Sequence, residues 1–198
     1  MSIVLVGSTS GSITLQEPAV AGTTVLTLPA VTGNVLTDTS PKAGNVLQVV
    51  SSTKTDTFSS STTGSWLDVT GISVSITPTS SSSKIMIFGR ITGMGTSSVT
   101  RLQMRLVRDS TAISIGDAAG SRLQVSGNEL YVLDNDALLG STIFFLDSPA
   151  TTSATTYKLQ IRNGNSAGTI YINRIPGDAD AIVTPRGTSS ITVMEIAA

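Results

Sequence analysis

The chain has 198 residues and a formal net charge of −1; it contains no cysteine and no histidine, and only 4% of its residues are aromatic. The missing cysteines exclude disulfides and thiolate sites, and the missing histidines remove the commonest general base and metal ligand. No basic cluster favours nucleic acid, and no apolar run approaches the roughly 18 residues of a membrane span. We therefore expect no enzymatic activity, no cofactor, and neither nucleic acid nor a membrane as a partner.

Residues 1–40 are predicted to form an extended β arm. The short apolar segment Ile3–Val6 is typical of a strand, as are Gly11–Gln16 and Gly22–Pro29, in which apolar and polar residues alternate; nearby prolines keep these strands short. Such a piece is too small to bury its own apolar face, so we expect it to dock on a larger object through main-chain hydrogen bonds at its strand edges. The residues expected to make this contact are Ile3, Val4, Leu5, Val6, Ile13 and Leu15.

Residues 41–198 are predicted to form a jelly-roll β-sandwich, so the expected fold class is all-β. Short alternating runs are separated by segments rich in Ser, Thr, Gly and Pro, a spacing typical of sandwiches and barrels. No segment has a convincing helical pattern, although 129–139 has room for one short turn. The predicted strands lie near 46–51, 54–58, 65–69, 72–78, 84–93, 99–108, 111–116, 121–125, 139–146, 155–163, 168–173 and 189–197.

The clearest pattern in the chain is the stretch Lys84–Asp109. It contains two runs of alternating apolar and polar residues, separated by a glycine-rich segment that begins at Gly93. A period of two residues indicates strands rather than a helix, and we predict two long antiparallel strands here. The apolar residues that share a face in these runs are Ile85, Ile87, Ile91, Leu102, Met104 and Leu106.

Several segments resemble structural proteins of tailed bacteriophages. The segment Gly7–Leu36, GSTSGSITLQEPAVAGTTVLTLPAVTGNVL, resembles a module that recurs in them. Later segments resemble the distal domain of phage fibre-like proteins, which is similar to the trimeric jelly rolls of the C1q and tumour-necrosis-factor families. The resemblance implies a virion component, a homotrimer and no enzymatic activity. The later segments are PKAGNVLQVV, SVSITPTSSSSKIMIFGRI, FFLDSPATTSATTYKLQIRN, TIYINR and SSITVMEI.

The absence of a shaft separates two functional hypotheses. No coiled coil, collagen repeat or β-helical repeat stands between the arm and the predicted sandwich. This favours a compact trimeric head decoration or cement protein on the virion surface, bound to a phage capsid protein. The alternative is a short tail fibre or spike, attached to tail proteins, whose distal domain binds a host glycan or protein. A secreted C1q-like binding domain is a third hypothesis, which leaves the arm unexplained.

Two acidic segments are the candidates for ion contacts. Asp134, Asn135 and Asp136 form the densest cluster of oxygen ligands, which fits a calcium contact at a loop tip or a polar turn capped by its own side chains. Because the cluster lacks the glycine and the further acidic positions of a calcium loop, the turn is favoured and we assign no metal site. Asp178 and Asp180 have the same interpretation.

Three arginines and the single tryptophan are the remaining candidates. Arg101, Arg105 and Arg108 concentrate positive charge on one side of a predicted strand, facing either solvent or acidic groups of a sister chain. Trp66 is either a core anchor, which is the default for a lone tryptophan, or a contact with a subunit or ligand. The sequence leaves both alternatives open.

Overall fold

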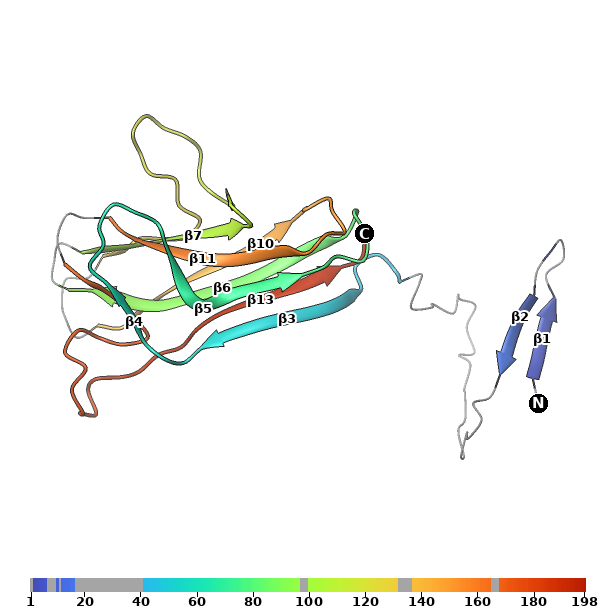
Figure 1. Cartoon of the computed structure of the whole chain (residues 1–198), viewed down its shortest axis with the longest axis horizontal. Coiled ribbons are helices and arrows are strands. Elements are labelled where there is room, and N and C mark those ends of the chain that lie inside the picture. Colours follow the sequence, from blue (N-terminus) through green and yellow to red (C-terminus); the bar gives the residue numbers. More distant parts are fainter. Residues whose placement is uncertain are drawn as a thin grey trace. The chain divides into compact units, whose positions relative to one another are not determined.

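The computed structural model describes residues 2–6, 10, 12–16, 41–96, 100–131, 137–164 and 168–198. The chain divides into two compact units, Met1–Val35 and Leu36–Ala198 (Figure 1). Every regular element in these ranges is a β-strand, which confirms the predicted all-β class. No helix in the described ranges is long and apolar enough to cross a membrane. The strand predicted at Gly22–Pro29 lies outside the described residues.

The described part of the first unit is a single antiparallel hairpin. It pairs β1 (Ser2–Val6) with β2 (Ser12–Gln16); strands were predicted at both positions, and their pairing was not. Ile3 lies opposite Leu15 and Leu5 opposite Ile13, so these four positions share one face of the hairpin. An isolated two-stranded hairpin is marginally stable at best in water.

The second unit contains two antiparallel sheets, which Figure 1 shows as stacked layers. The six-stranded sheet consists of β3 (Val46–Lys54), β4 (Phe58–Ser60), β6 (Lys84–Gly95), β10 (Leu139–Asp147), β12 (Ile170–Ile172) and β13 (Ser189–Ile196). The five-stranded sheet consists of β5 (Leu67–Ile76), β7 (Arg101–Arg108), β8 (Thr111–Ile113), β9 (Leu130–Tyr131) and β11 (Thr155–Asn163).

The order of the long strands is that of a jelly roll. One sheet runs β3-β13-β6 with β10 on the far side of β6, and the other runs β5-β11-β7 with β8 and β9 beyond β7. Successive long strands along the chain therefore alternate between the sheets. The first and last strands of the unit are neighbours, and the N–H of Ala197 donates to the carbonyl of Asn45 at 2.9 Å. The predicted jelly-roll sandwich is confirmed.

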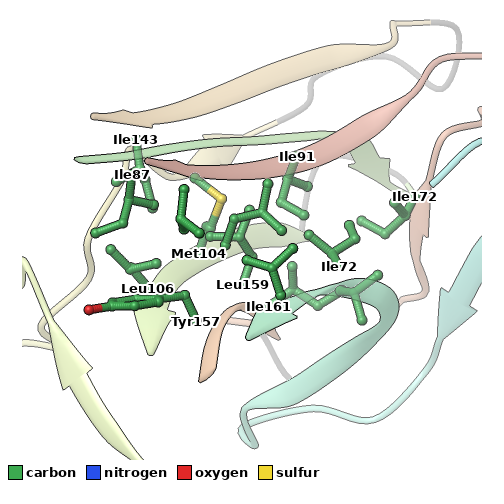
Figure 2. Close-up of a cluster of buried hydrophobic side chains, with 14 of the residues drawn as sticks. Ile72, Ile87, Ile91, Met104, Leu106, Ile143, Tyr157, Leu159, Ile161 and Ile172 are labelled. Atoms are coloured by element: carbon green, nitrogen blue, oxygen red, sulfur yellow. The ribbon is translucent and has the colours of Figure 1, made fainter. Parts of the chain in front are cut away.

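The core lies between the two sheets and is built from the inward residues of every long strand. Figure 2 shows these side chains interdigitating between the layers. A Cβ atom at Gly89 would lie 3.1 Å from Leu159 Cδ2, so the missing side chain lets Leu159 of the opposite sheet pack directly on β6. The six residues predicted to share faces are all buried here: Ile85, Ile87, Ile91, Leu102, Met104 and Leu106.

The strands β6 and β7 form as predicted, but they lie in different sheets. Neither pairs with the other: β6 pairs with β10, β12 and β13, and β7 pairs with β8, β9 and β11. The chain crosses from one layer to the other after Gly95, so the apolar faces of the two strands meet across the core. Alternation specifies which side of a strand is buried, but not which strand lies beside it.

Three further predictions about strands are wrong. The stretch 54–58 is not a strand but the connection between β3, which ends at Lys54, and β4, which begins at Phe58. The strands predicted at 65–69 and 72–78 are one strand, β5, because Gly71 with φ +89° absorbs an irregularity without ending the strand. The strand predicted at 121–125 is a loop. Its neighbour Ser126 explains this, because its hydroxyl donates to the carbonyl of Ile113 and accepts from the N–H of Leu106, which ties the loop across β7 and β8.

A buried carboxylate joins the two sheets at one end of the sandwich. Asp147 of β10 accepts a hydrogen bond of 2.7 Å from the hydroxyl of Tyr157 in β11 and bonds of 2.9 Å from Arg108 Nη1 in β7. Burial and the neighbouring carboxylate raise the pKa of Tyr157 far above its usual range. Tyr157 therefore remains a neutral donor, and Arg108 is a structural clamp rather than part of a free positive surface.

A second buried carboxylate, Glu195 of β13, fastens the loop between β5 and β6. It accepts two hydrogen bonds of 2.7 Å from the N–H and hydroxyl of Thr79, and one of 2.6 Å from Gln48 Nε2. Burial opposes the charged form, but the hydrogen bonds, led by that from Gln48, outweigh it and hold the pKa of Glu195 below its ordinary value of 4.5. The charged form of Glu195 is therefore favoured in the folded chain.

Lowering the pH is expected to destabilise the sandwich through Glu195. Its pKa is lower in the folded state than in the unfolded state, so its contribution is fully present above the unfolded value and disappears as the pH falls through the folded one. Glu195→Gln should lower the free energy of unfolding at neutral pH by about 1–3 kcal/mol and reduce its dependence on pH below about 5. Urea unfolding between about pH 6 and about pH 3 measures both. Equal pH dependence in the two proteins would contradict this role.

Candidate functional site

The outward face of the six-stranded sheet carries a patch of apolar side chains. In the register of the sheet, Val49, Met194, Met86 and Leu146 form one row that crosses β3, β13, β6 and β10. The next row contains Phe88 and Phe144 side by side. We call this patch the apolar face and define it by Val49, Met86, Phe88, Phe144, Leu146 and Met194.

The two phenylalanines are the largest side chains of the apolar face. Their rings lie edge to face with centroids 5.3 Å apart, an arrangement that aromatic pairs prefer. Phe144 is 69% exposed and Phe88 37%, so water reaches the pair. A contiguous apolar patch at a sheet surface commonly marks a contact with another protein.

Sequence reasoning did not identify the apolar face, although a signal for it exists. A strand with one face in water alternates apolar and polar residues, whereas Phe144–Phe145–Leu146 in β10 and Ile85–Met86–Ile87–Phe88 in β6 are apolar at both parities. Ile143 and Ile87 are buried in the core, and the residues of opposite parity point outward. Runs that are apolar at both parities, in a sheet that no further layer covers, are therefore the signal that could have revealed this surface in the sequence.

The outward face of the five-stranded sheet has the opposite character. Asp68 accepts hydrogen bonds from Lys158 (2.8 Å) and Gln160 (2.6 Å), and Gln160 accepts one of 2.7 Å from Arg105 Nε. In a second series of hydrogen bonds, Arg162 donates to Gln103 (2.7 Å) and Gln103 donates to Glu129 (2.6 Å). Arg101 also donates to Glu129. We call this surface the polar face; it comprises Trp66, Asp68, Arg101, Gln103, Arg105, Glu129, Tyr131, Lys158, Gln160 and Arg162.

Trp66 belongs to the polar face, so its default interpretation as a core anchor is wrong. The guanidinium carbon of Arg105 lies 4.4 Å from the centroid of its ring, and the side chain is half-buried. Trp66 has the same parity as Asp68, which points outward, while Leu67 between them packs against the core. Arg101 is held in a similar way, 4.9 Å from the ring of Tyr131.

The predicted docking residues lie in the hairpin. Ile3, Val4, Leu5 and Val6 are in β1, and Ile13 and Leu15 are in β2. Val6 is 79% exposed. Each strand of the hairpin pairs only with the other within the described residues. Docking through these residues remains a prediction.

The acidic candidates give no ion site in the described ranges. Asp134, Asn135 and Asp136 lie outside the described residues, and no group of three or more acidic side chains that could hold a metal occurs within them. Asp178 forms ion pairs with Arg186 (2.7 Å) and Arg174 (3.5 Å) in the β12–β13 loop. The interpretation of Asp178 and Asp180 as residues that cap their own turn stays a prediction.

Comparison with solved structures gives likenesses to viral proteins, two of which are described here. No protein-family model and no curated protein matches the chain. Among solved structures, one of infectious bursal disease virus strain Gt aligns over 96% of this chain with 14% identity and a TM-score of 0.42. One of strain Gx aligns over 96% with 15% identity and a TM-score of 0.40. This chain covers 44% and 50% of those chains, respectively, and likeness at this level carries no functional information.

Truncation of neighbouring residues of β10 is expected to lower the free energy of unfolding by different amounts. Ile143→Ala removes a buried side chain and should lower the free energy of unfolding by about 2–5 kcal/mol. Phe144→Ala removes an exposed one and should cost about 1 kcal/mol or less, chiefly its contact with Phe88. Urea unfolding measures both free energies, at protein concentrations low enough that copies of the chain do not associate. A larger cost for Phe144→Ala would place its side chain in the core.

Proposed function

We propose that this chain is a structural component of a tailed-bacteriophage particle. It forms a homotrimeric decoration or cement protein on the capsid surface and is attached by its N-terminal arm. The resemblance of the quoted segments to phage structural proteins supports the virion role, and the jelly roll agrees with the fold that the resemblance implies. The observation that carries the self-association is the apolar face.

Burial of the apolar face supplies a driving force for association. The patch crosses four strands, which places its outer residues about 14 Å apart across the sheet. Full burial of an exposed large apolar side chain contributes about 1.5–3 kcal/mol, and four of the six side chains of this face are exposed: Val49, Phe88, Phe144 and Leu146. Phe88 and Phe144 provide rigid anchors of the kind that dominate protein interfaces.

A sister copy is the partner that this patch fits best. The six defining residues carry no charge, so like patches meet without electrostatic repulsion. The polar face is less suited to contact a sister copy, because its charged side chains already form hydrogen bonds with charged and amide groups of the same surface. The resemblance implies three copies arranged about one axis.

The hairpin provides the attachment to the particle. Two strands do not form a stable sheet, so β1 and β2 require a neighbour that covers the face shared by Ile3, Leu5, Ile13 and Leu15. A capsid sheet that pairs with a free edge of the hairpin supplies main-chain hydrogen bonds and also covers this apolar face. Three hairpins on one trimer bind with raised effective concentration, so modest single contacts give durable attachment. A trimer that binds only the assembled shell stabilises it.

Placing a charge on the apolar face should disperse the trimer. Phe144→Glu forces an unpaired carboxylate into the contact, whereas Ser73→Glu adds the same charge at an exposed position of β5 in the other sheet. Sedimentation velocity should show single chains for Phe144→Glu and trimers for Ser73→Glu and the unchanged protein. Trimers in both variants would contradict association through this face, and single chains in the unchanged protein would contradict self-association altogether.

Attachment should depend on one face of the hairpin. Leu5→Asp changes the face that Leu5 shares with Ile13, whereas Thr14→Asp changes the exposed opposite face. Particles grown with Leu5→Asp should lack the protein, and those grown with Thr14→Asp should retain it. Gel densitometry counts the copies: hundreds per particle indicate a decoration protein, and a few tens or fewer indicate a tail fibre. Full occupancy with Leu5→Asp would contradict this mode of attachment.

A further inference from the structure

The loop 173–188, between β12 and β13, ends in a tip whose side chains contact little of their own chain. Ile182 is fully exposed and Val183 is 73% exposed, although both are large apolar residues. Asp180 is exposed as well and has no ion-pair partner among the described residues. Figure 1 shows the loop, drawn in red-orange, projecting from the end of the sandwich at which β13 begins. We call Asp180, Ile182 and Val183 the loop tip.

The rest of this loop is firmly held. The buried amide of Asn173 donates to two main-chain carbonyls around the end of β3, at 2.9 Å each. Asp178 pairs with Arg186 at 2.7 Å, and the hydroxyl of Thr184 donates to the carbonyl of Ala181 at 2.7 Å. An ordered loop loses little conformational entropy when it binds, so its exposed apolar tip is suited to a contact.

The base of the loop lies on the same side of the six-stranded sheet as the apolar face. Thr92 and Met94 have the parity of Phe88 in β6 and so point to the outer side of this sheet, yet they are 3% and 0% exposed. Residues of the loop cover them. Ile175 packs on Met94, and a Cβ atom at Gly187 would lie 2.6 Å from Thr92 Cγ2.

Arg90 is an exposed cation between the base of the loop and the apolar face. In the register of the sheet it lies beside Ser190 of β13 and Thr142 of β10. It has no ion-pair partner in the described part of the chain. The two carboxylates of this sheet, Asp147 and Glu195, are buried and already bonded. A partner that covers Arg90 must therefore bring a carboxylate of its own, because an unpaired buried charge is costly.

We propose that the loop tip of one copy docks on the six-stranded sheet of the neighbouring copy. Asp180 pairs with Arg90 of the neighbour, and Ile182 and Val183 pack against the edge of its apolar face at Phe88. The tip has a carboxylate next to two apolar side chains, and the sheet has a cation next to an aromatic pair, so the two surfaces are complementary in charge and in polarity. The inference rests on the proposed self-association and identifies the contact that specifies it.

The geometry of this contact agrees with a ring of copies. The loop tip and the sheet are different surfaces, so the contact is head to tail and repeats around a closed ring, as in a trimer. Sheets that pack face to face lie about 10 Å apart. The chain from Gly187 to Ile182 spans at most about 17 Å, so the tip can reach a neighbour. Arg90 lies only about 7 Å along β6 from Thr92, at the base of the loop.

A charge swap tests the ion pair. Arg90→Glu and Asp180→Arg each bring like charges together, so each should raise about 10- to 100-fold the protein concentration at which trimers are half dissociated. The double variant restores opposite charges and should return this concentration to within about threefold of the unchanged protein. Arg122→Glu and Asp117→Arg make the same changes at exposed positions of the β8–β9 loop and should shift it less than about twofold. Sedimentation velocity measures the dissociation, and circular dichroism checks the fold.

A matched pair of truncations tests the apolar part of the contact. Ile182→Ser removes the exposed side chain of the loop tip, and Leu123→Ser removes one that is 42% exposed in the β8–β9 loop. Ile182→Ser should raise the half-dissociation concentration about 10-fold, because the side chain is buried only in the trimer. Leu123→Ser should change it less than about twofold.

The outcomes separate this inference from the proposed function. Three results overturn the inference alone, in a protein whose trimers Phe144→Glu disperses: single charge variants that match their controls, a double variant that does not recover, or Ile182→Ser that matches Leu123→Ser. Single chains in the unchanged protein at every concentration would overturn both the inference and the proposed self-association. Weakening by each single variant with recovery in the double supports the docked tip, because a defect within one chain's fold gives no such recovery.

Discussion

Every long strand of the sandwich must present one side to the core, and what it presents on the other side distinguishes the two sheets. In the five-stranded sheet, β7 and β11 alternate apolar and polar residues, so their outer sides hold charged and amide groups bonded to one another. In the six-stranded sheet, β6 and β10 are apolar at both parities around Phe88 and Phe144. A fold of two layers has no third layer to cover the second apolar surface.

This asymmetry gives the two surfaces different physical roles. The apolar face gains most by leaving water, which the proposed association of copies would make possible. The polar face gains little from burial, because it would lose hydration while its groups are already paired. A trimer joined through one sheet would leave the polar face of the other sheet in contact with solvent.

Two buried carboxylates support the sheets that carry these surfaces. Asp147 in β10 connects Arg108 and Tyr157 of the opposite sheet, and Glu195 in β13 holds the loop around Thr79. Removing one partner of such a carboxylate leaves a buried charge without compensation, which lowers the stability of the fold. Both residues are in strands of the six-stranded sheet, so the clamps hold the sheet that presents the apolar face. Rigid support of this kind favours a surface that binds without rearrangement.

Local pattern determined much of this protein, and tertiary structure decided the rest. Alternation along single strands was enough to predict the all-β class, the strands β6, β7, β10, β11 and β13, and the inward residues such as Ile87 and Leu106. It could not predict that β6 and β7 lie in different sheets, or that Trp66 lies under Arg105 rather than in the core. The pairing of Met86 with Met194 and Leu146 into one surface was equally hidden, because these residues come from distant parts of the chain. The parity of a residue is a property of its own strand, whereas its neighbours across the sheet are chosen by packing over the whole domain.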